Sequence, residues 1–150
     1  MTNQTLKMRI GNAFIKMILR SPMHEKFSQN FLLISVTGRK SGKTYTTPVN
    51  YHRMGNTIMV ISMRERTWWR NLRGGAPVNL LLQGENIQGE GKVIEDDQGV
   101  AEGLAAILRQ TPDYAKYLDV TLDPDGQPAM DELNQAAKSR VIVEITLSPN

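Results

Sequence analysis

Six short runs of apolar and β-branched residues, separated by turn signals, constrain the fold of this chain more than any other feature. Runs of this length and composition are typical of β-strands. The tetrapeptide RMGN between the second and third runs is typical of a hairpin, and Pro48 within the second run predicts a sheet edge, a bulge or a strand end. The runs cover residues 30–38 (NFLLISVTG), 44–53 (TYTTPVNYHR), 56–62 (NTIMVIS), 77–84 (PVNLLLQG), 86–95 (NIQGEGKVIE) and 139–147 (SRVIVEITL).

Helical patterns lie before, between and after these runs. Residues 4–20 place apolar side chains at helical spacing and carry only basic charges. Residues 67–73 predict a short helix that ends at two glycines, and further helices are expected from Asp97 and after Pro112. The sequence therefore predicts an α+β fold, a small barrel of about six mainly antiparallel strands with flanking helices, formed as one domain by residues 1–150.

The composition excludes several classes of protein. The chain has 150 residues, of which 40% are hydrophobic and 22% charged, as in an ordinary globular protein. It has no cysteine and two distant histidines, His24 and His52, so we expect no disulfide, no thiolate catalysis and no metal site. The net charge of +3 is too small and too dispersed to predict a nucleic-acid-binding protein.

The expected location of the protein is the cytoplasm. No run reaches the roughly 18 apolar residues of a membrane span, and the N-terminus lacks the pattern of a signal peptide. The basic amphipathic helix predicted at 4–20 leaves a second interpretation open, in which that helix lies on an anionic membrane surface. Packing of its apolar side on the domain is the alternative.

A cluster of positive charge lies in the segment 38–44 (GRKSGKT), between the first two predicted strands. The segment resembles a phosphate loop, but its spacing is one residue short and it precedes a strand where a phosphate loop requires a helix. Arg39, Lys40 and Lys43 around such a glycine-containing turn nevertheless predict a site for phosphate or carboxylate groups. A solvated hairpin tip is the alternative.

Two further segments carry aromatic side chains in short helices. In RERTWWRNLRGG (64–75) the adjacent tryptophans point about 100° apart, so we expect one in the core and the other near the surface or a pocket. In TPDYAKYL (111–118), Tyr114 and Tyr117 share one side and either line a ligand pocket or bury their rings. No catalytic triad or acid–base carboxylate pair is evident, which favours a protein that holds a cofactor.

Four segments, in this order, resemble the deazaflavin-dependent nitroreductase family of the split β-barrel, flavin-reductase-like superfamily. They are TGRKSGKTYTTPVNY, VIS, TWWRNLRGGAPVNL and TPDYAKYL, and the similarity extends from about residue 32 to residue 147. The resemblance implies that the chain binds coenzyme F420, a deazaflavin with a phosphodiester and an oligoglutamate tail. It also implies hydride transfer to a small-molecule acceptor, namely a quinone, a nitro compound or an activated alkene.

The same resemblance implies roles for individual residues. Arg39, Lys40 and Lys43 would neutralise the anionic tail, while Ser62, Tyr114 and Tyr117 would hydrogen-bond the acceptor and act as the catalytic groups. The expected cofactor-binding residues are Arg39, Lys40, Ser41, Gly42, Lys43, Thr44, Thr47, Pro48, Ser62, Met63, Trp68 and Asn71.

This sequence also departs from the family pattern. Better-known members carry a lysine after the serine, where this chain has Met63, so Arg64 or Arg66 would have to supply the missing cation. Two alternatives therefore stay open: reduction with FMN as cofactor, and a non-catalytic protein that carries a cofactor, a lipid or heme. Family members are often homodimers, though several are not, and some that reduce menaquinone-like substrates are membrane-associated.

Overall fold

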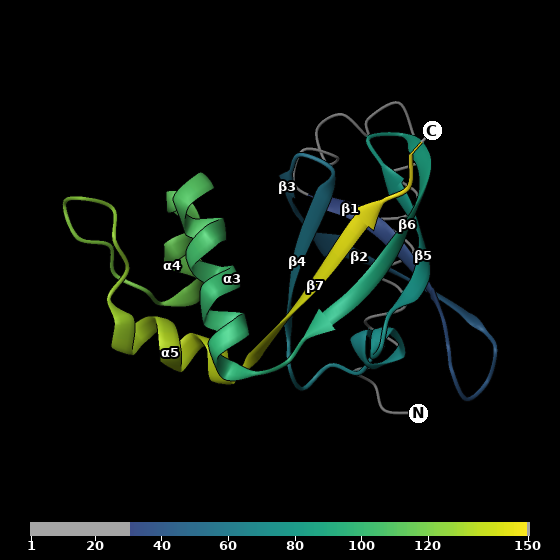
Figure 1. The fold of residues 1–150 in the computed structure, drawn as a ribbon, viewed down its shortest axis with the longest axis horizontal. Helices are drawn as coiled ribbons and strands as arrows, with labels where there is room; N and C mark the ends of the chain where they lie inside the picture. Colours follow the sequence, from purple (N-terminus) through teal and green to yellow (C-terminus); the bar gives the residue numbers. More distant parts are fainter. Residues whose placement is uncertain (1–30, 150) are drawn as a thin grey trace, which may run out of the picture.

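The computed structural model describes residues 31–149, in which seven strands form a single antiparallel sheet (Figure 1). The strands lie in the order β2-β1-β5-β6-β7-β4-β3, and each pairs antiparallel with its neighbours. Their bounds are Phe31–Thr37 (β1), Thr44–Asn50 (β2), His52–Met54 (β3), Thr57–Met63 (β4), Ala76–Leu82 (β5), Glu85–Ile94 (β6) and Arg140–Leu147 (β7).

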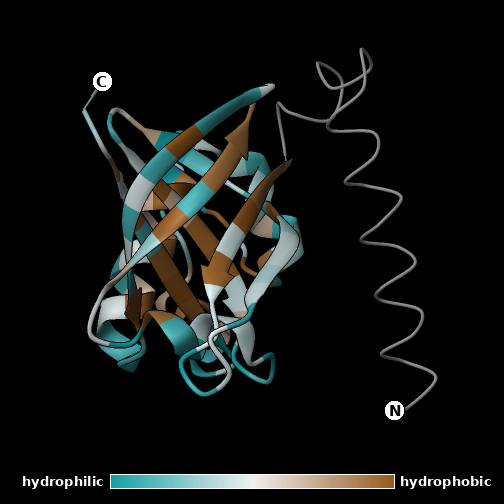
Figure 2. Ribbon diagram, turned by 90° about the vertical axis from the view of Figure 1, so that its right-hand side faces the viewer, coloured by the Kyte–Doolittle hydropathy of each residue, from teal (hydrophilic) through white to brown (hydrophobic). Residues whose placement is uncertain are grey.

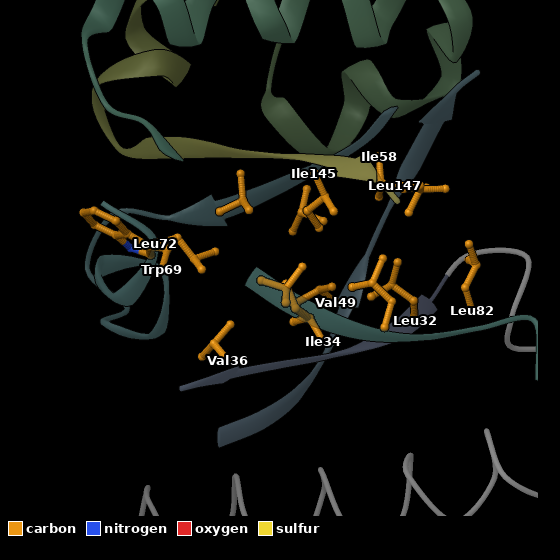
Figure 3. Packing of buried hydrophobic residues seen from close by; sticks show 14 of the residues in the cluster. Leu32, Ile34, Val36, Val49, Ile58, Trp69, Leu72, Leu82, Ile145 and Leu147 are labelled. Carbon is orange, nitrogen blue, oxygen red and sulfur yellow. The ribbon is translucent and has the colours of Figure 1, made fainter. Parts of the chain in front are cut away.

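The sheet curls into a barrel. Strand β2 is at one edge of the sheet and β4 is next to the other edge, yet the two strands contact each other. The sheet therefore closes on itself at this contact. The inward side chains form one apolar core, and the strands that supply them carry long hydrophobic stretches (Figure 2). Trp69 and Leu72, from the short 3-10 helix η1 (Trp68–Leu72), lie at one end of this core, and Leu82 lies toward the other end (Figure 3).

A helical layer covers the outer face of β4 and β7 (Figure 1). It consists of α3 (Asp97–Gln110), the 3-10 turn η2 (Pro112–Tyr114), α4 (Ala115–Leu118) and α5 (Met130–Lys138). Met59 of β4 and Ile142 of β7 belong to this second cluster, whereas Ile58 and Val60 of β4 belong to the barrel core. Successive side chains of β4 therefore alternate between the two layers, as expected for a strand.

The predicted fold class is confirmed, with differences in detail. The run at 44–53 is interrupted at Tyr51, so it forms both β2 and β3, and the described residues contain seven strands where about six were predicted. Pro48 does lie on an edge strand, and Gly55 forms the predicted hairpin turn with a φ of +64°. The predicted helix at 67–73 is the 3-10 turn η1, and α5 was not predicted individually.

The predicted helix at 4–20 lies outside the described residues, so the structure does not test its contact with a membrane. Among the helices of residues 31–149, none has both the length and the apolar character required to cross a bilayer.

Candidate functional site

The basic turn, which we define as residues 38–43 between β1 and β2, is closed by two backbone hydrogen bonds. The N–H of Gly38 donates to the carbonyl of Lys43 over 2.7 Å, and the N–H of Gly42 donates to the carbonyl of Gly38 over 2.8 Å. Gly42 has a φ of +72°, a backbone conformation that residues other than glycine rarely adopt. The turn is therefore well defined, and it presents Arg39, Lys40 and Lys43 to solvent.

These cations have no acidic partner within the described part of the chain. The ion pairs formed among residues 31–149 join other side chains and leave out Arg39, Lys40 and Lys43. Three positive charges on one short turn repel each other, and a bound anion would relieve that repulsion. The turn thus has the charge and the exposure that phosphate or carboxylate groups require.

A chain of hydrogen bonds connects the basic turn to the interior of the barrel. The backbone N–H of Arg39 donates to Oδ1 of Asn71 over 3.2 Å, and Nε of Arg39 donates to the carbonyl of Asn71 over 3.1 Å. Nδ2 of Asn71 donates to the carbonyl of Trp68 over 3.0 Å, and Nε1 of Trp68 donates to Oγ of Ser62 over 3.2 Å. Four residues expected at the cofactor site are thereby brought together from three elements.

Ser62 is buried, with 4% of its surface exposed, on the inner side of β4. Its Oγ accepts the indole N–H of Trp68 and donates to the carbonyl of Met63 over 3.2 Å. The hydroxyl proton is therefore already used within the protein. In this arrangement Ser62 fixes the orientation of the Trp68 indole, which packs half-buried against the barrel core.

We expect Ser62→Ala to loosen Trp68. The substitution leaves the indole N–H without its acceptor, which should lower the free energy of unfolding by about 1 kcal/mol. Urea denaturation checks the stability, and Trp68 fluorescence in a Trp69→Phe background reports the indole alone, because the chain has two tryptophans. Ser62→Thr keeps the hydroxyl and serves as the control. Unchanged stability together with an unchanged emission spectrum would contradict this role of Ser62.

Thr47 and Arg66 meet at the seam of the barrel, which we define as the contact between β2 and β4. Thr47 is buried on the inner side of β2, with 9% of its surface exposed, and its Oγ1 accepts a hydrogen bond from Arg66 over 3.3 Å. The guanidinium of Arg66 is half-buried, and this burial lowers its pKa because a charge loses solvation there. Arg66 has no carboxylate partner among residues 31–149.

Arg64, the other candidate for the missing cation, has a structural role. Its guanidinium donates to the carbonyls of Glu95, Arg140 and Lys138 over 2.7, 3.0 and 3.2 Å, and it lies 3.7 Å from the carboxylate of Asp97. These contacts tie the end of β4 to the beginning of α3 and to the junction of α5 and β7. Of the two arginines, only Arg66 is free of such contacts within the described chain.

Tyr114 and Tyr117 lie elsewhere, in a hollow of about 800 Å³ that we call the tyrosine hollow. Their ring centroids are 5.3 Å apart, and the centroids of Tyr114 and His52 are 4.7 Å apart with the two rings nearly perpendicular. Tyr114 packs against the helical layer, on the outer side of β4, whereas Ser62 faces the barrel interior. The hollow is lined by Phe31, Asn50, Tyr51, His52, Arg53, Gln83, Gln110, Thr111, Asp113, Tyr114, Lys116 and Tyr117, and so by none of the residues expected to bind the cofactor.

The position of His52 in this hollow was not predicted, because β3 and η2 are far apart in the chain. Burial lowers the pKa of His52 below its ordinary value of 6.5, and burial also raises the pKa of Tyr114. Nε2 of His52 is buried and has no hydrogen-bond partner among the described residues. Burial therefore favours the neutral form of the imidazole over the protonated form.

The lowered pKa of His52 predicts a loss of stability in acid. The unfolded chain binds the proton more readily than the folded one, so the stabilisation is complete above pH 6.5 and is lost as the pH falls through the lower pKa of the folded state. We expect the melting temperature to fall between about pH 7 and pH 5, and to fall less in His52→Gln. Equal pH dependence in both proteins would contradict this prediction.

Comparison with known proteins identifies a family by sequence and several solved structures with a similar fold. The family profile described as F420H(2)-dependent quinone reductase matches residues 8–123. HutZ, the heme storage protein from Vibrio cholerae, is similar in structure with a TM-score of 0.55 and 12% identity, over 87% of this chain and 92% of HutZ. A pyridoxamine 5'-phosphate oxidase-like protein from Listeria innocua has a TM-score of 0.53 and 14% identity, over 80% of this chain and 85% of its own.

At such low identity these structures show the fold alone, and the curled sheet described above is a split β-barrel. No curated protein sequence matches the chain.

Proposed function

The chain belongs to the F420H(2)-dependent quinone reductase family, and we propose that it uses reduced F420 to reduce a quinone, a nitro compound or an activated alkene. One observation carries the proposal most directly. The basic turn, whose cations have no acidic partner among residues 31–149, is connected through Arg39 and Asn71 to the half-buried indole of Trp68. One elongated ligand with an anionic end and a planar end therefore fits both features. F420 has these two ends.

The residues of the site fit the cofactor at both ends. Arg39, Lys40 and Lys43 would bind the phosphodiester and the glutamates, with Ser41, Gly42 and Thr44 offering amides or hydroxyls. Ser41 is exposed, and its Oγ already accepts the N–H of Lys43 over 3.2 Å, which shapes the turn. Thr47 and Pro48 lie on the strand that leads inward from this turn, and Trp68 and Asn71 lie on the adjacent η1.

The bound deazaflavin would supply a hydride to the acceptor, which takes up a further proton to complete its reduction. The protein would contribute binding, orientation and exclusion of water rather than a covalent catalyst. Ser62 would hold the Trp68 indole beside the cofactor ring, through the hydrogen bond that it accepts from the indole N–H. Tyr114 and Tyr117 have no part in this step, because β4 separates the tyrosine hollow from Ser62 and from the Trp68 indole that Ser62 holds.

The test is the reoxidation of reduced F420 by the purified protein with menadione or a nitroaromatic compound as acceptor. We expect the absorbance of the oxidised deazaflavin to return faster with protein and acceptor together than with either alone. Tight binding of F420 without acceleration for any acceptor in a panel would instead indicate a cofactor carrier. A yellow preparation that works with FMN and not with F420 would indicate a flavin enzyme.

A further inference from the structure

Arg66 holds a partly buried positive charge that the described protein leaves without an anionic partner. The single hydrogen bond of the Arg66 side chain within residues 31–149 goes to the neutral hydroxyl of Thr47, over 3.3 Å. Glu65, the adjacent residue, is exposed and does not pair with it. Burying a guanidinium that has one neutral acceptor and no anionic partner within residues 31–149 is costly, and the same burial lowers the pKa of Arg66.

Other arginines of the site region differ from Arg66 in this respect. Arg64 donates to three backbone carbonyls, Arg73 forms a two-point contact with Glu95 at 2.9 and 2.8 Å, and Arg39 donates to the carbonyl of Asn71. The side chain of Arg70 forms no ion pair within residues 31–149, but it is exposed to water and its guanidinium lies 5.6 Å from the centroid of the Trp69 ring. Arg66 is thus the cation whose environment most favours a ligand.

The position of Arg66 identifies the part of the ligand that it would contact. The basic turn lies at the outer end of the hydrogen-bond chain through Asn71 and Trp68, whereas Arg66 and Thr47 lie at the seam. Arg66 is two residues from the half-buried Trp68 in the chain, and the Trp68 indole donates to Ser62 of β4, one of the two strands of the seam. The flexible, negatively charged tail of the ligand would bind the exposed cations of the basic turn. A planar ring that carries carbonyl oxygens suits a seam with an indole and a guanidinium, because the guanidinium can donate to those oxygens.

We propose that Arg66, supported by Thr47, binds the carbonyl-bearing edge of the cofactor ring and thereby favours its reduced form. This inference rests on the proposed use of F420. The reduced ring is richer in electrons than the oxidised ring, so a fixed positive charge at its edge stabilises the reduced form more. Arg66 would then act on the ring, independently of the residues that bind the tail.

The experiment measures binding by fluorescence with two probes, intact F420 and its deazaflavin chromophore without phosphate and glutamates, each oxidised and reduced. We expect Arg66→Gln to weaken binding of the tail-less chromophore by about 10- to 100-fold, and more for the reduced form than for the oxidised form. Arg66→Lys, which keeps the charge, should retain most of the preference for the reduced form. Lys43→Ala should weaken binding of intact F420 only.

Arg70→Gln is the matched control, because it removes one exposed arginine from the same region and should leave both affinities unchanged. The melting temperature of Arg66→Gln should not fall, since the substitution removes a half-buried charge that lacks a carboxylate partner among the described residues.

Three results would overturn the inference while leaving the proposed function in place. They are unchanged binding of the tail-less chromophore by Arg66→Gln, an equal loss for its oxidised and reduced forms, and binding of intact F420 by the unsubstituted protein without binding of the tail-less chromophore. Failure of the unsubstituted protein to bind intact F420 would overturn the proposed function as well.

Discussion

Replacing Arg39 and Lys43 together with alanine is expected to weaken F420 binding by about 100-fold or more at low salt. Both side chains are exposed on the basic turn and have no acidic partner within residues 31–149, so their charges are available to an anionic tail. The backbone N–H of Arg39 can still donate to Asn71 after substitution, which preserves part of the link to η1. Fluorescence titration of the variant and the unsubstituted protein measures the change.

The loss should depend on ionic strength. Salt screens the interaction between exposed charges, so the difference between the two proteins should shrink as salt increases. The control is the double variant Arg109→Ala and Lys138→Ala, which removes the same charge from the last turns of α3 and α5. If the two double variants bind F420 equally well, net charge rather than the basic turn governs affinity and the assignment of the tail site is wrong.

Trp69→Ala should cause a large loss of stability, with the free energy of unfolding lowered by about 3–5 kcal/mol. Trp69 is 1% exposed and lies at the end of the barrel core beside Leu72 (Figure 3), so truncation leaves a cavity that the β-sheet cannot readily fill. Trp68→Ala should cost less, because Trp68 is only half-buried, but it should weaken F420 binding by about tenfold. Urea denaturation and cofactor titration of both variants separate the two roles.

Trp69→Phe tests the reason for the loss. The indole Nε1 of Trp69 is buried and has no hydrogen-bond partner among the described residues, so a phenyl ring keeps most of the apolar volume and removes an unsatisfied donor. We expect Trp69→Phe to be far more stable than Trp69→Ala. Similar stabilities for the two variants would show that the volume of the ring is not what the core requires.

The arrangement of the barrel was largely predictable because its signals are local. The strand runs and the Gly55 turn depend on neighbouring residues in the sequence, and they were correctly predicted. For Pro48 the sequence left an edge, a bulge or a strand end open, and the structure shows the edge. The split of the second run was not predicted, because Tyr51 is itself a good strand residue. The break arises because β2 pairs with β1 whereas β3 pairs with β4, on the other side of the seam.

The site was predictable only in part, because its remaining features depend on distant elements. The sequence could not distinguish Arg64 from Arg66, since the choice depends on carbonyls of Glu95, Lys138 and Arg140 that the fold brings to Arg64. The grouping of Ser62 with the tyrosines followed from resemblance alone. In the structure, β4 separates them, because Ser62 faces the barrel core while Tyr114 packs with the helices on the other side.

The central claim is that this protein binds F420 through the basic turn and the seam of the barrel. Its most direct test is a fluorescence titration of the purified full chain with F420 and, in parallel, with FMN, each at low and moderate salt. We predict saturable binding of F420 that weakens as salt increases, with FMN bound weakly or not at all. Binding of FMN alone, or of neither compound, would contradict the account and assign the barrel to a flavin enzyme or to a carrier of another ligand.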